Sequence, residues 1–345
     1  MTTFTRRLAL LGTVFGAALA ASTGAQAQGQ LTVYCGVQED WCRPMVDAFE
    51  KATGVKVSMI RKSSGEIYAQ VKAEASNPRG DVWWGGTGDP HMQAAEENLT
   101  EEYKSPKLPE LNEWAVRQWE QSKGRAVGIY SGALGFAYNT KLLAEKKIDD
   151  PKCWADLLNP KLKDEVQVAD PNSSGTAYTM LATLVQIMGE DKAFDYMKKL
   201  HANVNQYTKS GAAPAKATSL GETTVGIAFL HDHVTMIVEG APMKAVAPCE
   251  GTGYEIGSMS IIKGAKNLDN AKKWYDWALS PEAQKLGAAA KSYQVPSNKA
   301  TPIPPQAPKL SDIKLINYDF AKYGSSDERK RLLTKWDKEV KAQPK

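Results

Sequence analysis

The stretch LTVYCGVQEDWCRPMVDAFEKATGVKVSMIRKSSGEIYAQVKAEASNPRGDVWW, residues 31–84, alternates between extended and helical patterns. The extended runs lie at 31–34, 55–60 and 80–84, and the helical patterns between them lie at 40–53 and 63–76. Strands that alternate with helices predict a parallel sheet with helices on both faces. Ligands of such sheets lie at the carboxyl ends of the strands. We therefore predict an α/β fold whose site is built from the loops that lead from strands into helices.

Two later spans are expected to carry the chain between two lobes. The span 125–138 is apolar, β-branched and punctuated by glycine, and the span 254–263 is again extended. About 318 residues follow the expected signal peptide, which is more than one hydrophobic core commonly supports, so two domains are expected. The predicted bounds are 28–134 plus 258–300 for lobe 1, and 135–257 plus 301–345 for lobe 2.

The first 27 residues have the features of an export signal. Arg6 and Arg7 precede an apolar run from Leu8 to Ala21, and the stretch ends on Ala25-Gln26-Ala27. We expect cleavage near Ala27 and a periplasmic location for the mature chain. The paired arginines leave open whether export follows the Sec or the twin-arginine route.

Charge and hydropathy narrow the class of protein. Without the two signal arginines the formal net charge of +4 falls to about +2, with acids and bases interspersed, so nothing indicates a nucleic-acid partner. No later segment approaches 18 continuous apolar residues, so we expect no membrane span after the signal.

Four cysteines in an exported chain favour two disulfides over a metal site. Cys35 and Cys42 are close enough to close a short loop, which leaves Cys153 to pair with Cys249. The sequence alone still leaves three connectivities open. We expect the cysteines to act as staples without chemistry of their own.

Two serine-rich loops follow predicted strands and open predicted helices, namely Ser63-Ser64-Gly65-Glu66 and Ser173-Ser174-Gly175-Thr176. Backbone amides and hydroxyls at a helix N-terminus bind anions. For either motif alone, helix capping is the alternative, with Glu66 completing a capping box. One such loop in each predicted lobe favours an anion held between them, and Gly85-Gly86-Thr87-Gly88 and Ser210-Gly211 are further loops of this type.

A polar cluster, His231-Asp232-His233, follows an extended run at 223–230. Three interpretations are open: hydrogen bonds from His231 and Asp232 to sugar hydroxyls, a metal site that uses both imidazoles on one face of a strand, or ordinary structural residues. The first is favoured because adjacent donor and acceptor groups suit a vicinal diol. Glu255, or else Glu250, is expected to add a carboxylate.

The mature chain resembles the periplasmic solute-binding proteins of bacterial ABC importers, in the group of the ferric-iron-binding proteins. The resemblance extends over nearly all of the mature chain. It implies the type II periplasmic binding protein fold, in which two α/β lobes are joined by two hinge strands and the ligand cleft lies between them. The segments that carry it are Leu31-Thr32-Val33-Tyr34, Phe49-Glu50-Lys51-Ala52-Thr53-Gly54, Ala137-Tyr138-Asn139-Thr140 and Ile262-Lys263-Gly264-Ala265-Lys266-Asn267.

One position separates the branches of this group. Iron-binding members place two adjacent tyrosines after the strand that ends here at Leu230, whereas this sequence has His231-Asp232. The chain is more similar to the hexose-phosphate-binding branch, in which a His-Asp pair and a downstream Glu hold the sugar while serine and threonine loops hold the phosphate. The residues to which the resemblance assigns ligand contacts are Ser63, Ser64, Thr87, Ser173, Ser174, Gly175, Thr176, His231, Asp232, and Glu255 in preference to Glu250.

The expected protein is a monomeric substrate-binding component of an ABC importer. It would capture a small anionic solute, a hexose phosphate above others, and deliver it to an inner-membrane permease with its ATPase. We expect no catalytic residue, no metal and no cofactor. Two alternatives remain: a carrier of ferric iron or another metal that uses His231, His233 and a tyrosine, and a periplasmic hydrolase with His231 and Asp232 as base and orienter. The hydrolase lacks a Gly-x-Ser-x-Gly or zinc signature.

Overall fold

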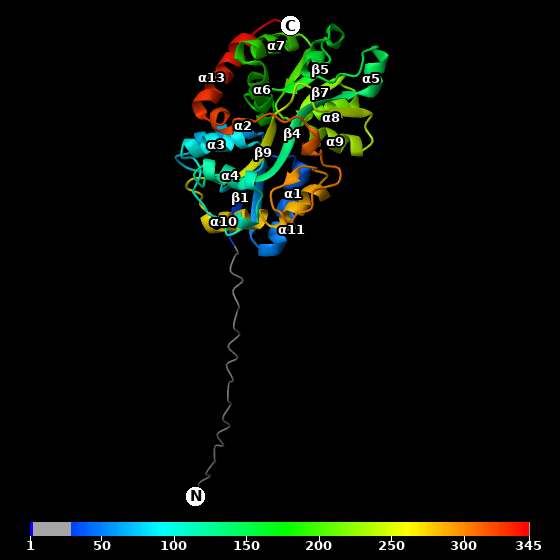
Figure 1. Ribbon diagram of the computed structural model, residues 1–345. Helices are drawn as coiled ribbons and strands as arrows, with labels where there is room; N and C mark the ends of the chain where they lie inside the picture. The colour runs from blue at the N-terminus through cyan, green and yellow to red at the C-terminus, as the bar shows by residue number, and fades with distance from the viewer. Residues whose placement is uncertain (3–28, 345) are drawn as a thin grey trace.

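The computed structural model describes residues 1–2 and 29–344 (Figure 1). The expected signal peptide and its cleavage point therefore lie outside the described residues, apart from the first two positions. Within the described part of the chain, no helix has the length and apolar character needed to cross a membrane.

Eight strands form one continuous sheet in the order β2-β1-β3-β9-β4-β7-β5-β6, and two short strands, β8 and β10, pair with β4. The strands are β1 Gln30–Cys35, β2 Lys56–Arg61, β3 Val82–Trp84, β4 Val127–Asn139, β5 Val166–Ala169, β6 Val204–Thr208, β7 Val225–Phe229, β8 Met243–Val246, β9 Tyr254–Ile261 and β10 Val295–Pro296.

The described helices cover the faces of this sheet (Figure 1). They are α1 Glu39–Thr53, α2 Ser64–Ala73, α3 Gly88–Glu96, α4 Glu113–Gln121, α5 Thr140–Glu145, α6 Gly175–Met188, α7 Glu190–His201, α8 Ala213–Leu220, α9 Leu230–Val238, α10 Leu268–Ala278, α11 Pro281–Ala289, α12 Phe320–Tyr323 and α13 Ser326–Trp336. A π-helical turn at Asp337–Lys341 follows α13.

The parallel pairing predicted from the alternation is confirmed on both sides of the sheet. Strand β1 pairs in parallel with β2 and β3, and β5 pairs in parallel with β6 and β7. Between these two groups, β4 and β9 run antiparallel to each other. Side chains that follow the parallel strands are therefore brought to the middle of the molecule, where the carboxyl ends of the two groups meet.

Strand β4 belongs to both groups. All thirteen of its residues are buried. Its segment from Val127 to Ala133 pairs with β9, and its segment from Leu134 to Tyr138 pairs with β7. Figure 1 shows β4 and β9 side by side through the centre of the molecule.

Two large hydrophobic cores flank this centre. One is built from residues between Leu31 and Tyr130 together with residues between Met259 and Ala283. The other is built from residues between Leu134 and Phe229 together with residues between Tyr318 and Val340. The lobe bounds given above remain a prediction, which this division of the cores supports.

Both disulfides join the cysteines that were expected to pair. Cys35 and Cys42 close the loop between β1 and α1, and Cys153 and Cys249 join segments that are 96 residues apart. Among the described residues no free cysteine remains.

The structure corrects one local expectation. His231, Asp232 and His233 do not end a strand but form the first turn of α9, which follows β7 directly. A helix advances about 100° per residue, so side chains two positions apart point in different directions. His231 and His233 therefore do not share a face, and the paired-imidazole metal site that depended on that face is not formed.

Candidate functional site

A cavity lies where the carboxyl ends of the two strand groups meet. Its empty volume is about 400 Å³, including the opening to solvent, which is within the range of about 300–1,000 Å³ typical of small-molecule sites. Nine of the predicted ligand residues line it: Ser63, Ser64, Thr87, Ser174, Gly175, Thr176, His231, Asp232 and Glu255.

Three helices begin at this cavity. They are α2, α3 and α6, whose first residues are Ser64, Gly88 and Gly175. The tips of α3 and α6 touch, because a Cβ added at Gly175 would lie 1.8 Å from Thr87 Oγ1. Each helix N-terminus presents amide hydrogens and a partial positive charge, so their convergence forms an anion-binding wall.

The hydroxyl groups of this wall have different tasks. Thr87 Oγ1 is buried and has no hydrogen-bond partner among the described residues, so it is available to a ligand. Ser64 Oγ accepts a hydrogen bond from the Thr87 amide at 3.1 Å and holds that loop. Ser174 Oγ accepts from the Ala177 amide at 3.4 Å, so the capping role considered for this motif is present at the cavity wall.

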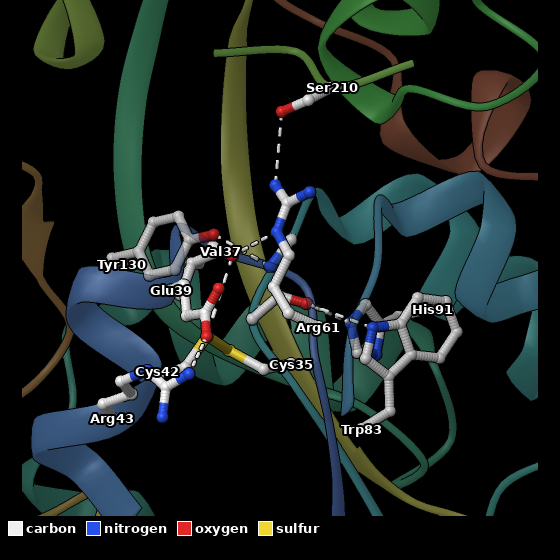
Figure 2. The surroundings of a disulfide bond; sticks show 12 residues. Cys35, Val37, Glu39, Cys42, Arg43, Arg61, Trp83, His91, Tyr130 and Ser210 are labelled. Atoms are coloured by element: carbon white, nitrogen blue, oxygen red, sulfur yellow. Dashed lines mark hydrogen bonds and ion pairs between the residues drawn. A yellow bond between two sulfur atoms is a disulfide. The ribbon is translucent and has the colours of Figure 1, made fainter. Parts of the chain in front are cut away.

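Arg61 also lines the cavity, although the sequence gave us no reason to select it. It is the last residue of β2. Its Nε donates to Val37 O at 2.9 Å, and its Nη2 donates to Ser210 Oγ at 3.2 Å. Figure 2 shows the side chain extended between these two partners. Burial lowers the pKa of Arg61 from its usual value, but an arginine stays charged at neutral pH and suits a phosphate group.

The Cys35–Cys42 disulfide fixes a further part of the wall (Figure 2). The loop that it closes supplies Gly36, Val37 and Gln38 to the cavity. Gln38 Nε2 donates to Asp232 Oδ1 at 2.6 Å, which links this loop to α9 on the other side of the cavity.

The opposite end of the cavity is acidic and contains an imidazole. His231 Nε2 lies 3.8 Å from Asp232 Oδ1 and 3.8 Å from Glu255 Oε1. His231 is 4% exposed, Asp232 8% and Glu255 4%. These three groups are thus largely removed from water, which disfavours the charged form of each.

Burial sets the protonation of this end. It lowers the pKa of His231 to about 3, and the nearby His233 lowers it further. Burial raises the pKa of Asp232 to about 7 against the opposing effect of Arg61. The pKa of Glu255 is raised well above its usual value by burial and then by the charges of Asp232 and Asp89. The imidazole is therefore uncharged at neutral pH, and the contacts at 3.8 Å are not ion pairs.

An uncharged imidazole beside protonated carboxyl groups offers both hydrogen-bond donors and acceptors. This combination suits hydroxyl groups, which also donate and accept. The cavity thus has one wall for an anion and one for a polyhydroxyl group, and a single small molecule can reach both.

Two of the predicted residues lie outside the cavity lining. Ser173 Oγ donates to Lys209 O at 3.2 Å, so its hydroxyl is used within the protein. The Glu250 carboxylate accepts from the amides of Trp154 and Ala155 at 2.8 and 3.0 Å, beside the Cys153–Cys249 disulfide. These backbone contacts hold Glu250 away from the cavity, so the second choice for the acidic partner is corrected.

The metal alternative finds no ligand set at the cavity. His233 is fully buried and does not line it. Tyr130 does line it, but its hydroxyl accepts a hydrogen bond from the Gly86 amide at 2.9 Å. Within the described ranges, the one group of suitably spaced ligand atoms is Cys153, Cys249 and Glu250, and both of its sulfurs are in a disulfide.

The residues that sequence reasoning missed differ in how they could have been found. Arg61 stands two positions before the Ser63 loop, so a basic residue at the end of a strand was a usable signal. Tyr130 and Gln294 reach the cavity from segments next to the antiparallel strands, and no local pattern marks them.

Comparison with known proteins agrees with this geometry. The model of the bacterial extracellular solute-binding protein family matches residues 86–323. The chain belongs to this family. An uncharacterized protein from Haemophilus influenzae is 50% identical to this solute-binding protein over 331 residues, which cover 95% of each chain.

Solved structures of other solute-binding proteins have the same fold. The periplasmic binding protein AfuA from Actinobacillus pleuropneumoniae, with exogenous fructose 6-phosphate bound, matches with a TM-score of 0.89 and 50% identity over 91% of this chain and 99% of that one. Iron-bound HitA from Pseudomonas aeruginosa matches with a TM-score of 0.74 and 21% identity over 88% and 98% of the two chains. The type II periplasmic binding protein fold and the resemblance to the hexose-phosphate branch are both confirmed.

Proposed function

We propose that this solute-binding protein is the periplasmic component of an ABC importer and that it captures a hexose phosphate for delivery to an inner-membrane permease. The phosphate would lie against the first residues of α2, α3 and α6, with Arg61 as its cationic partner. The sugar hydroxyls would meet His231, Asp232 and Glu255. In this proposal the protein binds its solute and does not transform it.

The observation that carries the proposal is the two-ended cavity. Three helix N-termini and one arginine form one wall, and three buried, largely uncharged titratable side chains form the other. Inorganic phosphate would use only the first wall, and a neutral sugar only the second. A phosphorylated sugar uses both, which agrees with the fructose 6-phosphate bound to AfuA.

Contacts across the cavity support a clamp that closes on its solute. Gln38 reaches Asp232, and Arg61 reaches Ser210. The Gly65 amide donates to Ser173 O at 3.0 Å. A solute that touches both sides favours this closed arrangement over an open one, because it gains its full set of contacts only when the sides meet.

The test is calorimetric titration of the purified mature protein with fructose 6-phosphate, fructose, inorganic phosphate and ferric citrate. We expect fructose 6-phosphate to bind with a Kd in the micromolar range or below, about −8 kcal/mol or stronger, and fructose to show no measurable binding. Inorganic phosphate should bind more weakly than the sugar phosphate. Tight binding of ferric citrate without binding of the phosphate ester would overturn the proposal.

A second measurement separates binding from catalysis. Native mass spectrometry of protein purified from its host without dialysis should show a co-purified solute with the mass of a sugar phosphate. Incubation with fructose 6-phosphate should release no inorganic phosphate. Release that disappears in the His231→Ala variant would instead support the hydrolase alternative.

A further inference from the structure

The loop Asp170–Ser174 has two tasks at the cavity. Its last residue, Ser174, lines the cavity at the start of α6. The Ser173 carbonyl accepts the hydrogen bond from Gly65 on the opposite side. The position of this loop therefore sets part of the anion-binding wall and also one contact that closes the cavity.

Within the loop, Asp170 fixes the backbone. Its carbonyl accepts hydrogen bonds from the amides of Ser173 and Ser174 at 3.1 and 2.9 Å. Its carboxylate accepts from the Asn172 amide at 2.9 Å. Whatever holds Asp170 therefore holds the loop.

The C-terminal segment Ser326–Lys341 contacts this loop from outside the cavity. Lys341 Nζ lies 2.5 Å from Asp170 Oδ2. Asn172 Nδ2 donates to Asp337 Oδ1 at 2.9 Å, and Arg329 Nη2 donates to Pro171 O at 3.3 Å. None of the three contacting residues of the segment lines the cavity.

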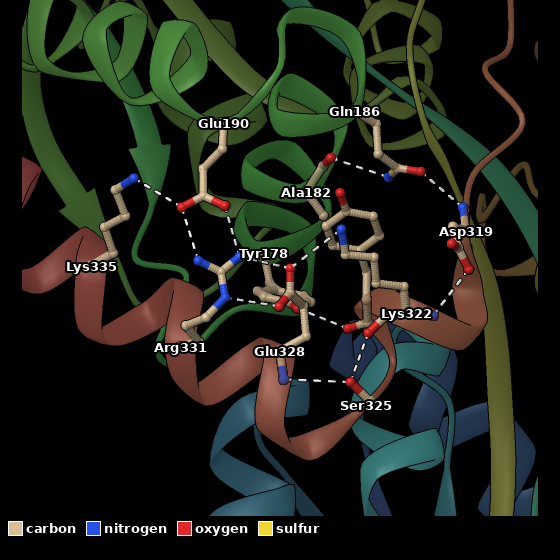
Figure 3. Close-up of polar contacts among 11 residues, drawn as sticks. Tyr178, Ala182, Gln186, Glu190, Asp319, Lys322, Ser325, Glu328, Arg331 and Lys335 are labelled. Carbon is tan, nitrogen blue, oxygen red and sulfur yellow. Dashed lines mark hydrogen bonds and ion pairs between the residues drawn. The ribbon is translucent and has the colours of Figure 1, made fainter.

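The segment is itself anchored to the second core by other residues. Figure 3 shows Arg331 and Lys335 of α13 reaching Glu190, the first residue of α7. Two nitrogens of Arg331 contact the two carboxylate oxygens at 2.8 and 2.7 Å, and Lys335 Nζ lies 2.8 Å from Oε1. Arg329 also lies over the ring of Tyr178 in α6, 4.3 Å from its centroid. The segment therefore has fixed supports that do not involve the loop.

The charges along this contact are stable at neutral pH. Burial would raise the pKa of Asp170, but the hydrogen bonds from Lys341 and Asn172 lower it below its usual value. The hydrogen bond to Asp170 raises the pKa of Lys341. The pair is therefore a charged one, with 14% of the Asp170 side chain and 47% of the Lys341 side chain exposed.

We propose that the segment Ser326–Lys341 is a brace that positions the Asp170–Ser174 loop for phosphate binding and for closure of the cavity. Lys341, Asp337 and Arg329 are its positioning residues, and none of them touches the solute. The inference rests on the proposed function, since it assumes that the loop contacts the phosphate group of the solute.

The test compares two lysines of this segment. Lys341→Met removes the ion pair with the loop, whereas Lys335→Met removes an ion pair with Glu190 and leaves the loop contacts in place. Calorimetric titration with fructose 6-phosphate should give a Kd about threefold higher for Lys341→Met, and roughly tenfold higher when Asp337→Ala is added, as expected for partly exposed polar contacts. Lys335→Met should bind as the wild type does, and Lys341→Arg should restore binding.

A second readout needs no solute. Hydrogen exchange of the amides at 172–176 in the ligand-free protein should be faster in Lys341→Met than in the wild type, and unchanged in Lys335→Met. Unchanged affinity and unchanged exchange in Lys341→Met with Asp337→Ala would overturn the brace, as would an equal effect of Lys335→Met. If the wild type binds no phosphate ester but the exchange rates differ as described, the brace stands and the proposed function fails.

Discussion

Arg61 and Asp232 divide the work of the cavity between them. Arg61 is the one lysine or arginine among the described residues that line it, and Asp232 is a buried acid at its other end. Both also take part in contacts across the cavity. Their side chains are therefore the most informative ones to change.

Replacing each of these residues should affect different ligands. Arg61→Met should weaken both fructose 6-phosphate and inorganic phosphate by at least tenfold, because a charge-assisted hydrogen bond contributes about 1.5–3 kcal/mol. Asp232→Ala should weaken the sugar phosphate by a similar factor and change phosphate binding by less than about twofold, since only hydroxyl contacts are lost. Calorimetric titration of both variants with both ligands measures this. Equal losses for both ligands in Asp232→Ala would show that the cavity is not divided in this way.

The raised pKa of Asp232 also predicts how stability depends on pH. The unfolded value is about 3.9, and the folded value is about 7. Between these values the folded chain holds a proton that the unfolded chain releases, so the contribution of Asp232 to stability is lost as pH rises through 7. Asp232→Asn removes this term. Relative to the wild type, its free energy of unfolding in urea should be higher at pH 8 than at pH 4.5 by on the order of 2 kcal/mol. A difference that is constant over this range would contradict the prediction.

The contact between α3 and α6 makes Gly175 sensitive to any side chain. A methyl group at Gly175 would lie 1.8 Å from Thr87 Oγ1, so the two helix tips would have to separate. We expect Gly175→Ala to fold with an unchanged melting temperature in the absence of solute, yet to bind fructose 6-phosphate at least tenfold more weakly, about 1.4 kcal/mol. Gly287→Ala in α11 is the control, because this position lies outside the cavity lining and should keep the affinity of the wild type. Wild-type affinity in Gly175→Ala would mean that the tips do not need to touch.

Regular alternation made much of the fold predictable. The strands and helices of residues 31–84 and the two central strands follow from hydrophobic periodicity and glycine stops, because packing on a sheet imposes these patterns. Helix α9 was missed because β7 runs into it at Leu230 without a glycine or proline between them. The cavity residues on serine loops were predictable, since a helix start has a local signature. Tyr130 and Gln294 were not, because only the tertiary fold brings them to the cavity.

The two disulfides belong to different parts of the whole molecule and should have separable roles. Cys35–Cys42 holds a loop of the cavity wall, whereas Cys153–Cys249 closes a long stretch of the second half. Replacing Cys153 and Cys249 with alanine should lower the free energy of unfolding by about 3 kcal/mol, because the unfolded chain is then less restricted. The affinity for fructose 6-phosphate should be retained.

Replacing Cys35 and Cys42 with alanine should have the opposite emphasis. The closed loop is short, so we expect a smaller loss of stability, and the freed segment Gly36–Gln38 should raise the Kd for fructose 6-phosphate by several fold. Urea unfolding and calorimetry on both double variants decide this. A loss of affinity in the Cys153 and Cys249 variant alone would reverse the assignment.

The interleaving of the two cores has a consequence for how the chain matures. The core that begins at Leu31 is completed only by residues from Met259 to Ala283. A polypeptide threaded through a translocation pore from its N-terminus cannot finish this core until that distant stretch has emerged, so its early strands wait with apolar surface uncovered. Threaded export would thus require a holding chaperone on the far side of the membrane, a need that export of the already folded molecule would remove.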